Sequence, residues 1–171
     1  MPGPNETGGS PNRPVAEKKR ALRREMRSMR KGLANRSERS EAIVEHLLGI
    51  EAVRAASCVL AYESVPGEVE TSQLVAWCGS NGVGVVMPED DELVPDRFDV
   101  IVVPGTAFTT SGARLGQGGG WYDRFLPLRR RDAVTIGLGF REQIVVDLPT
   151  EPHDVILDCV VTDDGAVWAD G

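Results

Sequence analysis

Apolar residues along the chain recur at two different spacings, which predict an alternation of helices and strands. Near-helical spacing predicts helices where apolar positions share one face, and glycines mark several of the ends. The predicted helices cover residues 17–31, 38–48, 70–78 and 121–130. Short, continuously apolar runs predict strands over residues 58–62, 83–87, 98–103, 134–138 and 155–162, with an edge strand at 167–168.

Strands that are apolar on both faces and alternate with helices are typical of a parallel sheet lying between helices. The pattern therefore predicts the α/β class: a single-domain open, mostly parallel sheet flanked by helices on both faces, which is a three-layer αβα sandwich. We expect this domain to cover residues 15–171. Residues 1–14 are rich in Pro, Gly, Asn and Ser, which predicts a disordered tail. In such sheets ligands bind beyond the carboxyl ends of the strands, so we look for chemistry in residues 63–68, 104–120 and 139–143.

Charge is unevenly distributed along the 171 residues, and this limits the function classes. The whole chain has a net charge of −7, which argues against a general nucleic-acid binder. Residues 13–39 nevertheless hold 11 Lys and Arg against three acidic residues, and no lysine follows Lys31. Any lysine that binds an anion must therefore be Lys18, Lys19 or Lys31.

The same composition predicts the compartment. No apolar run approaches the roughly 20 residues that span a bilayer, and the N-terminus lacks a secretory pattern. The three cysteines, Cys58, Cys78 and Cys159, are far apart and include no CxxC pair, so neither a disulfide framework nor a zinc site is indicated. These features predict a cytoplasmic protein that binds no membrane.

The most unusual stretch is the glycine-rich segment over residues 112–120, which precedes a predicted helix. Glycines let backbone amides turn toward one point and let a phosphate approach closely. Arg114 adds a permanent charge with a forked donor geometry, and Asp123 has the chemistry to hold a Mg²⁺ ion that bridges phosphates. The segment matches neither the Rossmann nor the Walker pattern, and a merely tight or flexible loop is the alternative.

Three further features suggest a site, each with an ordinary structural alternative. Glu68 lies on a loop at a strand end, and it is either a carboxylate of the site or an ordinary surface residue. His153 precedes a predicted strand, and it is either a general base or a structural or exposed residue. Four cations share one face of the first predicted helix, either closing over polyphosphate or facing solvent: Lys19, Arg23, Arg27 and Arg30.

Several motifs together resemble the 5-formyltetrahydrofolate cyclo-ligase (methenyltetrahydrofolate synthetase) family. They follow the family's order between about residues 17 and 168, and the segment from Arg114 to Asp123 is the most specific. The motifs are Lys19-Arg-Ala-Leu-Arg23, Glu68-Val-Glu-Thr71, Arg114-Leu-Gly-Gln-Gly-Gly-Gly-Trp-Tyr-Asp123-Arg-Phe-Leu126, Gly137-Leu-Gly-Phe140 with Gln143, Leu148-Pro149, His153-Asp154 and Val161-Thr162.

The resemblance implies an open α/β sandwich and an ATP- and Mg²⁺-dependent enzyme. Its reaction converts 5-formyltetrahydrofolate to 5,10-methenyltetrahydrofolate and releases ADP and phosphate. In the family, the formyl oxygen attacks the γ-phosphate, and the neighbouring folate nitrogen then closes the ring as phosphate departs. The implied substrate is the folate in monoglutamyl or polyglutamyl form, with no nucleic-acid partner. We expect a monomer or a weak homodimer.

Carried over by position, the resemblance also implies roles for individual residues. The implied catalytic residues are Arg114 and Asp123, and the implied metal ligands are Asp123 and Asp154. ATP binding falls to Lys19, Arg20, Ala21, Leu22, Arg23, Arg114, Leu115, Gly116, Gln117, Gly118, Gly119, Gly120, Trp121 and Tyr122. Substrate binding falls to Glu68, Gln117, Gly118, Gly119, Gly120 and Trp121.

Three departures from the family pattern leave alternatives open. Trp121 stands where the family usually has a tyrosine, Gln117 occupies an often aromatic or basic position, and a segment that typical members carry after Met87-Pro88 is missing. One alternative is a non-catalytic or repurposed relative that binds nucleotide or folate. Another is an RNA-associated protein that uses the basic helix.

Overall fold

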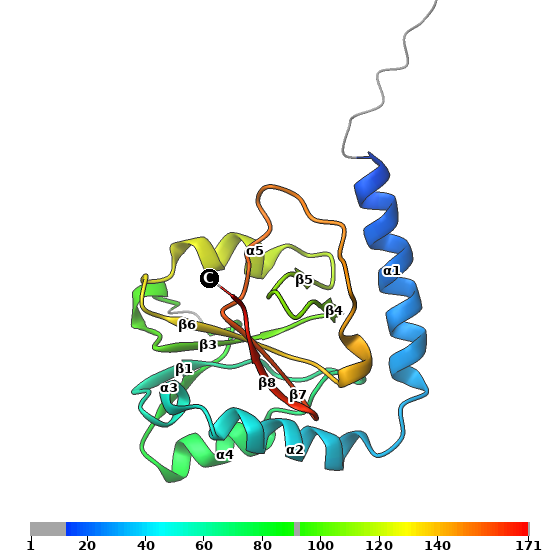
Figure 1. Ribbon diagram of the computed structural model, residues 1–171. Helices are drawn as coiled ribbons and strands as arrows, with labels where there is room; N and C mark the ends of the chain where they lie inside the picture. Colours follow the sequence, from blue (N-terminus) through cyan, green and yellow to red (C-terminus); the bar gives the residue numbers. More distant parts are fainter. Residues whose placement is uncertain (1–12, 91–92, 171) are drawn as a thin grey trace, which may run out of the picture.

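The structure is a computed structural model that describes residues 13–90 and 93–170. Its central sheet has six strands in the order β2-β1-β3-β6-β7-β8 (Figure 1). Neighbouring strands are parallel except β7 and β8, which run antiparallel. The strands are β1 (Cys58–Leu60), β2 (Gly84–Val86), β3 (Val100–Pro104), β6 (Val134–Leu138), β7 (Cys159–Thr162) and β8 (Gly165–Trp168). A separate hairpin pairs β4 (Ala107–Phe108) with β5 (Arg114–Leu115).

Helices cover both faces of the sheet, which confirms the predicted α/β sandwich. One face carries α2, α3 and α4, and the other carries α5 and a 3₁₀ turn, whereas α1 stands beside the end of the sheet (Figure 1). The helices are α1 (Arg13–Lys31), α2 (Arg36–Leu48), α3 (Glu51–Arg54), α4 (Ser72–Ser80) and α5 (Trp121–Phe125), with 3₁₀ turns η1 (Pro95–Arg97), η2 (Leu126–Leu128) and η3 (Arg141–Gln143). Within the described ranges, no helix combines the length and apolar character needed to cross a membrane.

The central strands are apolar throughout because each faces two cores. Along β3, Val100 and Val102 pack in the cluster that α2 and α4 cover, while Ile101 and Val103 pack in the cluster that includes Phe125 of α5. All four β3 valine and isoleucine side chains are fully buried. Successive strand residues point to opposite faces, so burial on both sides requires a continuous apolar run.

Helix α1 begins earlier than predicted. Arg13 and Pro14, assigned to the tail from the sequence, form its first residues. Proline fits in the first turn of a helix because its missing N–H is not needed there. The rest of the predicted tail, residues 1–12, lies outside the described residues.

Other element boundaries differ for identifiable reasons. The helix predicted over 121–130 ends at Phe125 and continues as η2, since Pro127 has no N–H to extend the α-helix. The strand predicted over 155–162 begins only at Cys159, because the Leu157 amide bonds to the carbonyl of Gly112 instead of to the sheet. Helix α3 and the β4–β5 hairpin were not predicted, and β5 occupies part of the expected glycine loop.

One aromatic ring seats the hairpin on the sheet. Phe108 of β4 is fully buried, and three glycines leave room for its ring. A Cβ at Gly105, Gly137 or Gly139 would lie 2.5, 2.6 or 2.9 Å from ring carbons. Gln143 then donates from Nε2 to the carbonyls of Gly105 and Thr106 at 3.0 Å each. The Gly137-Leu-Gly-Phe140 motif with Gln143 therefore positions the hairpin.

This packing yields a stability prediction for Gly137→Ala. The added methyl would lie 2.6 Å from the Phe108 ring and 2.9 Å from Leu157 Cδ1, so we expect a loss of about 1–3 kcal/mol in the free energy of unfolding. Thermal denaturation should show a fall in Tm of roughly 2–4 °C per kcal/mol. Gly79→Ala in α4, where a Cβ meets nothing within 4 Å, is the control and should leave Tm equal or higher. An equal Tm for Gly137→Ala and wild type would contradict the packing argument.

Candidate active site

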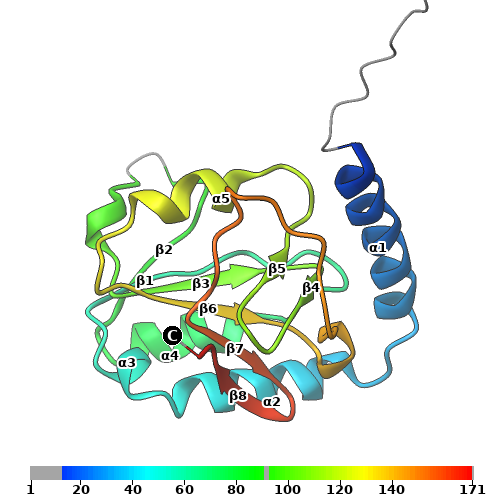
Figure 2. The same cartoon turned by 45° about the horizontal axis from the view of Figure 1, so that its top comes forward.

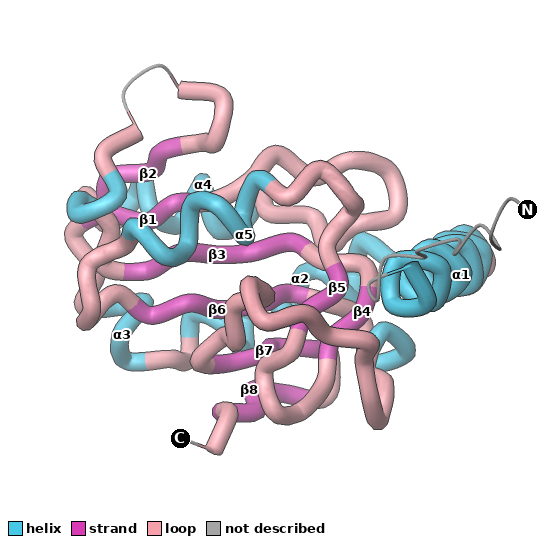
Figure 3. The backbone as a smooth tube through the Cα atoms, turned by 90° about the horizontal axis from the view of Figure 1, so that it is seen from above, coloured by secondary structure: helices cyan, strands magenta, loops and turns pink. Residues whose placement is uncertain are grey.

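A cavity of about 310 Å³ lies where α1 meets the glycine loop. Figure 2 shows α1 alongside the end of the sheet toward which β3 and β6 point, which are the carboxyl ends of these strands. Seen from above, the β4–β5 hairpin lies between the sheet and α1 (Figure 3). The lining comes from four parts of the chain: Lys19 and Arg23; Pro104; Arg114 to Asp123; and Glu151, His153 and Asp154. Residues far apart in sequence thus converge where parallel sheets bind ligands.

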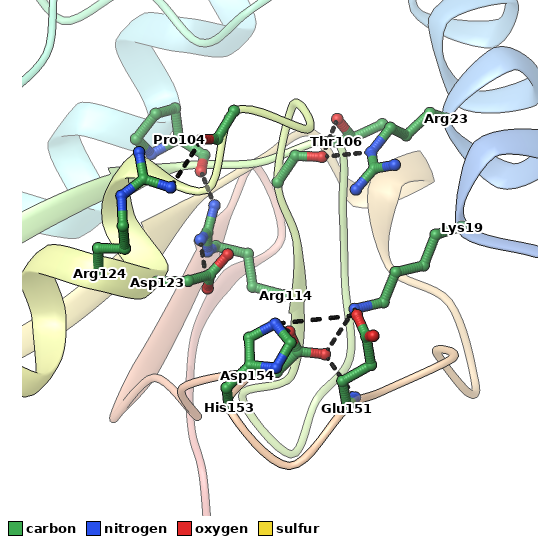
Figure 4. A network of polar contacts seen from close by, with 12 residues as sticks. Lys19, Arg23, Pro104, Thr106, Arg114, Asp123, Arg124, Glu151, His153 and Asp154 are labelled. Atoms are coloured by element: carbon green, nitrogen blue, oxygen red, sulfur yellow. Dashed lines mark hydrogen bonds and ion pairs between the residues drawn. The ribbon is translucent and has the colours of Figure 1, made fainter. Parts of the chain in front are cut away.

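The glycine loop, residues 116–120, is held by arginines that donate to its carbonyl groups. Arg23 Nε donates to the Gly116 carbonyl at 2.9 Å, and Arg27 NH2 donates to that of Gln117 at 3.2 Å. Arg124 NH1 donates to the Gly119 carbonyl at 3.1 Å (Figure 4). Within the described ranges, the amides of residues 116–120 donate to no protein acceptor. The carbonyls are therefore tied while the amides remain available to an anion.

Two glycines of this loop have backbone angles that favour glycine. Gly118 has φ 112°, and Gly120, the residue before α5, has φ 69°. Side chains disfavour this left-handed region because of their Cβ atom. The sequence thus permits a tight path from β5 into α5 that a chain of ordinary residues would resist.

Arg114 is the buried cation of the site, with a side chain that is only 4% exposed. Its NH1 donates to the Pro104 carbonyl at 3.2 Å, and its NH2 pairs with Asp123 Oδ1 at 3.1 Å (Figure 4). Its guanidinium lies 5.5 Å from the centre of the Tyr122 ring. Burial lowers the pKa of Arg114, and the charge of Asp123 opposes that shift. The side chain is thus fixed from three sides before any ligand arrives.

Lys19 forms the second charged group, on the opposite side of the cavity. Its Nζ lies 2.8 Å from Glu151 Oε2 and 2.8 Å from Asp154 Oδ2 (Figure 4). The Glu151 amide also donates to Asp154 Oδ2 at 2.7 Å. Burial alone would lower the pKa of Lys19, but the hydrogen bonds to the two carboxylates outweigh it and the pKa is raised. Lys19 therefore remains an ammonium ion at neutral pH.

Glu151, His153 and Asp154 offer three ligand atoms within 4.8 Å of one another. His153 is exposed, and its Nε2 lies 3.8 Å from Asp154 and 3.9 Å from Glu151. Glu151 was not predicted, since nothing in the local sequence distinguishes it from other acids in a proline-rich loop. Its contact with Lys19 and its place beside His153 and Asp154 reveal it.

Glu68 contacts the glycine loop from outside the cavity. It is 9% exposed, and its Oε1 accepts a hydrogen bond from Gln117 Nε2 at 2.8 Å. Its Oε2 accepts one from the Val65 amide at 3.1 Å. Glu68 does not line the cavity described above, but Gln117 connects the two.

Trp121 is held by aromatic contacts. Its ring stacks on Phe125 with centroids 4.7 Å apart and meets Tyr122 edge to face, also at 4.7 Å. The Tyr122 hydroxyl is buried without a hydrogen-bond partner in the described part of the chain. Burial raises the pKa of Tyr122 well above its ordinary value, so it stays neutral.

The structure separates the predicted site residues into two groups. The following line the cavity: Lys19, Arg23, Arg114, Leu115, Gly116, Gln117, Gly118, Gly119, Gly120, Trp121, Tyr122, Asp123 and Asp154. Arg20 and Ala21 are exposed on α1, and Leu22 packs against the apolar cluster of Met26 and Leu115. Because residues four apart share a helix face, Lys19 and Arg23 point to the cavity while the residues between them turn away.

The predicted metal carboxylates have different partners. Asp154 bonds to Lys19, whereas Asp123 pairs with Arg114 and is not among the three close ligand atoms. Their assignment to one metal stays a prediction. The row of four cations also divides, because Arg30 is buried at the other end of α1 and does not line the cavity.

The family model and three curated relatives that match this chain all carry the same family name. The sequence model of the 5-formyltetrahydrofolate cyclo-ligase family matches residues 15–93 and 89–163. The 5-formyltetrahydrofolate cyclo-ligase of Haemophilus influenzae is 26% identical over 178 residues, which cover 82% of this chain and 95% of that protein. The yeast cyclo-ligase is 37% identical over 86 residues, which cover 47% of this chain but only 41% of that protein. The match to the mitochondrial Arabidopsis thaliana protein covers 32% of its length.

The alignment with the Haemophilus influenzae protein also shows that this chain lacks residues that a relative has. The 178 residues aligned with the Haemophilus protein outnumber the 171 of this chain, so that protein has residues without a counterpart here. The two segments that match the family meet at residues 89–93, where the sequence predicts the loss.

Solved structures share the fold. A methenyltetrahydrofolate synthetase from Aquifex aeolicus superposes with a TM-score of 0.79 at 24% identity and covers 90% of this chain and 94% of its own. That of Mycoplasma pneumoniae gives a TM-score of 0.76 at 25% identity, covering 85% of this chain and 98% of its own. The family match over most of the sequence and the shared sheet agree. This chain belongs to the 5-formyltetrahydrofolate cyclo-ligase family.

Proposed function

We propose that this protein catalyses the ATP-dependent conversion of 5-formyltetrahydrofolate to 5,10-methenyltetrahydrofolate, with release of ADP and phosphate. The observation that carries the proposal is the convergence of unpaired loop amides, Arg114 and Lys19 on one cavity. The family match supplies the substrate class. The expected protein is cytoplasmic, monomeric or weakly dimeric, and needs no nucleic acid.

The reaction sequence follows from the family's chemistry. The formyl oxygen attacks the γ-phosphorus of ATP, the bond to the bridging oxygen breaks, and ADP departs. The neighbouring folate nitrogen then attacks the activated formyl carbon, and the phosphate leaves with the oxygen. Charge on the transferred phosphoryl group must be neutralised, and water must be kept out.

The chain's own residues supply this neutralisation. Arg114 lines the cavity and is fixed in place by Pro104 and Asp123, so its charge is positioned there without reorganisation during the reaction. Free amides of residues 116–120 add further donors. Donors that are positioned before charge develops stabilise a transition state more than mobile ones.

The donor set fits a divalent cation. Glu151, His153 and Asp154 combine carboxylate and imidazole ligands at close range, and Asp123 lies on the same cavity. Bound Mg²⁺ would neutralise phosphate charge. The charged side chains of the lining also support this assignment, because three cations (Lys19, Arg23, Arg114) face three acids (Asp123, Glu151, Asp154). A nucleotide polyphosphate adds negative charge to a balanced cavity, so an accompanying cation is expected.

The decisive test is the absorbance of the methenyl product when ATP, Mg²⁺ and 5-formyltetrahydrofolate are supplied together. Product that requires all three supports the proposal. Nucleotide binding by calorimetry without product would instead favour a non-catalytic relative, and the shortened segment after Pro88 would then be the first region to examine.

Arg114→Met should lower turnover by at least about tenfold, which is roughly 1.4 kcal/mol of transition-state stabilisation. The substitution removes the buried charge, and the unbranched methionine side chain keeps the apolar packing of the arginine stem. Arg131→Met, at an exposed arginine outside the cavity, is the control and should keep the wild-type rate. A rate within twofold of wild type for Arg114→Met would remove this residue from the mechanism.

Lys19→Met should raise the KM for ATP by about tenfold, with a smaller change in the KM for folate. The ammonium is the cation that α1 presents beside Glu151 and Asp154. Lys18→Met, at the neighbouring exposed lysine, is the matched control for loss of one charge. Initial rates over a series of ATP concentrations measure the effect, and an unchanged ATP dependence would count against the role of Lys19.

A further inference from the structure

Arg30 occupies the opposite end of α1 from the nucleotide side of the cavity. A helix rises 1.5 Å per residue, so its Cα lies about 16 Å along the axis from that of Lys19. Arg30 is 6% exposed, unlike the solvated arginines of the same helix. A side chain that carries a permanent charge is rarely buried to this extent without a partner.

Arg30 lacks such a partner. Its Nε and NH1 are buried and make no hydrogen bond within the described ranges. By contrast, Arg39 is paired with Glu142 and Asp163, and Lys19 with Glu151 and Asp154. Burial lowers the pKa of Arg30, and the charge of Glu68 only partly opposes this. A buried guanidinium with unmet donors reduces stability, so its presence calls for another explanation.

Another unmet donor lies in the same neighbourhood. The Tyr122 hydroxyl is buried without a partner among the described residues. Glu68 is connected to this part of α1 by hydrogen bonds, because Gln117 donates to Glu68 and Arg27, three residues before Arg30, donates to the Gln117 carbonyl. The charge of Glu68 also raises the pKa of both Arg30 and Tyr122. Glu68 does not satisfy either group, because its oxygens accept from Gln117 and Val65. The unmet donors of Arg30 and Tyr122 therefore share the influence of Glu68, the carboxylate to which the family resemblance assigns folate binding.

We propose that Arg30 is a substrate-binding residue whose unpaired Nε or NH1 donates a hydrogen bond to an acceptor oxygen of the folate. This inference rests on the proposed function and adds a residue to its folate side. The two ends of α1 then serve two ligands, with Lys19 and Arg23 at the nucleotide and Arg30 at the folate. Since the donor atoms are covered, binding requires side chains around Glu68 to move, and we expect the Gln117–Glu68 hydrogen bond to be exchanged for substrate contacts.

The test compares folate binding with stability in Arg30→Met. Calorimetry with 5-formyltetrahydrofolate and no ATP should give a Kd at least about tenfold weaker than that of wild type. The Kd for magnesium nucleotide should stay within about twofold. Tm should be equal or higher, because methionine fills the space and removes an unpaired buried charge. Arg24→Met, at an exposed arginine of the same helix, should change none of the three values.

Each outcome decides the inference. An unchanged folate Kd in folded Arg30→Met overturns it, and a lower Tm with unchanged folate affinity assigns Arg30 a structural role. If Arg30→Met does not fold, Arg30→Lys keeps the charge and loses the forked donors; weaker folate binding supports the inference, and unchanged binding overturns it. If the wild type makes methenyl product and Arg30→Met binds folate as tightly as the wild type, the inference about Arg30 is overturned and the proposed function stands. Wild type that binds folate without forming product overturns only the proposed function.

The accepting oxygen lies either on the glutamate carboxylates or on one of the uncharged carbonyls of the pterin ring, the formyl group and the benzoyl group. Repeating the titrations with 5-formyltetrahydropteroyl amide, which lacks the glutamate and has no carboxylate, distinguishes the two classes. If the tenfold difference between wild type and Arg30→Met persists, the bond is to an uncharged carbonyl; if the difference disappears, the bond is to a glutamate carboxylate.

Discussion

The site depends on hydrogen bonds between arginines and the carbonyls of the glycine loop. Arg23 and Arg27 of α1 donate to Gly116 and Gln117, and so connect the beginning of the chain to a loop more than 80 residues away. A hydrogen bond from a charged donor to a carbonyl contributes about 1.5–3 kcal/mol. Without these bonds the loop would keep its glycines but lose contacts that orient its carbonyls and leave its amides free.

The parallel sheet makes this arrangement possible by bringing loops of distant sequence to one edge. Pro104 ends β3 and accepts from Arg114, while the segment with Glu151 and Asp154 precedes β7. The hairpin with Phe108 fills the space above β6, where Gly137 and Gly139 leave room for its ring. The motifs that identify the family therefore divide between two tasks, because some contact the cavity and others hold the hairpin that carries Arg114.

Local sequence features predicted what depends on local physics. Repeated glycines ahead of a helix predict the loop, and continuous apolar runs predict the central strands. The two-residue strands β4 and β5 are too short to show alternation. Pro127 lies inside the run of residues that predicts one long helix, and it ends α5 early. Long-range contacts could not be predicted: the ion pair that marks Glu151 as a site residue is with Lys19, 132 residues away. The cations of α1 likewise look equivalent in sequence, and only packing shows that Arg30 turns inward.

The composition of α1 also links its stability to its ligands. Burial lowers the pKa of Arg23, and the charges of Arg27 and Arg20 lower it further. Like charges four residues apart, such as those of Arg23 and Arg27, destabilise a helix. Among the described residues, the apolar cluster that joins α1 to the body is small. It packs Leu22, Met26 and Met29 with Ala107, Ala113, Leu115, Val145 and Leu148. An anion bound between α1 and the glycine loop would relieve the repulsion. Ligand binding and the docking of α1 should therefore reinforce each other, since a ligand that prefers the docked helix stabilises it by mass action.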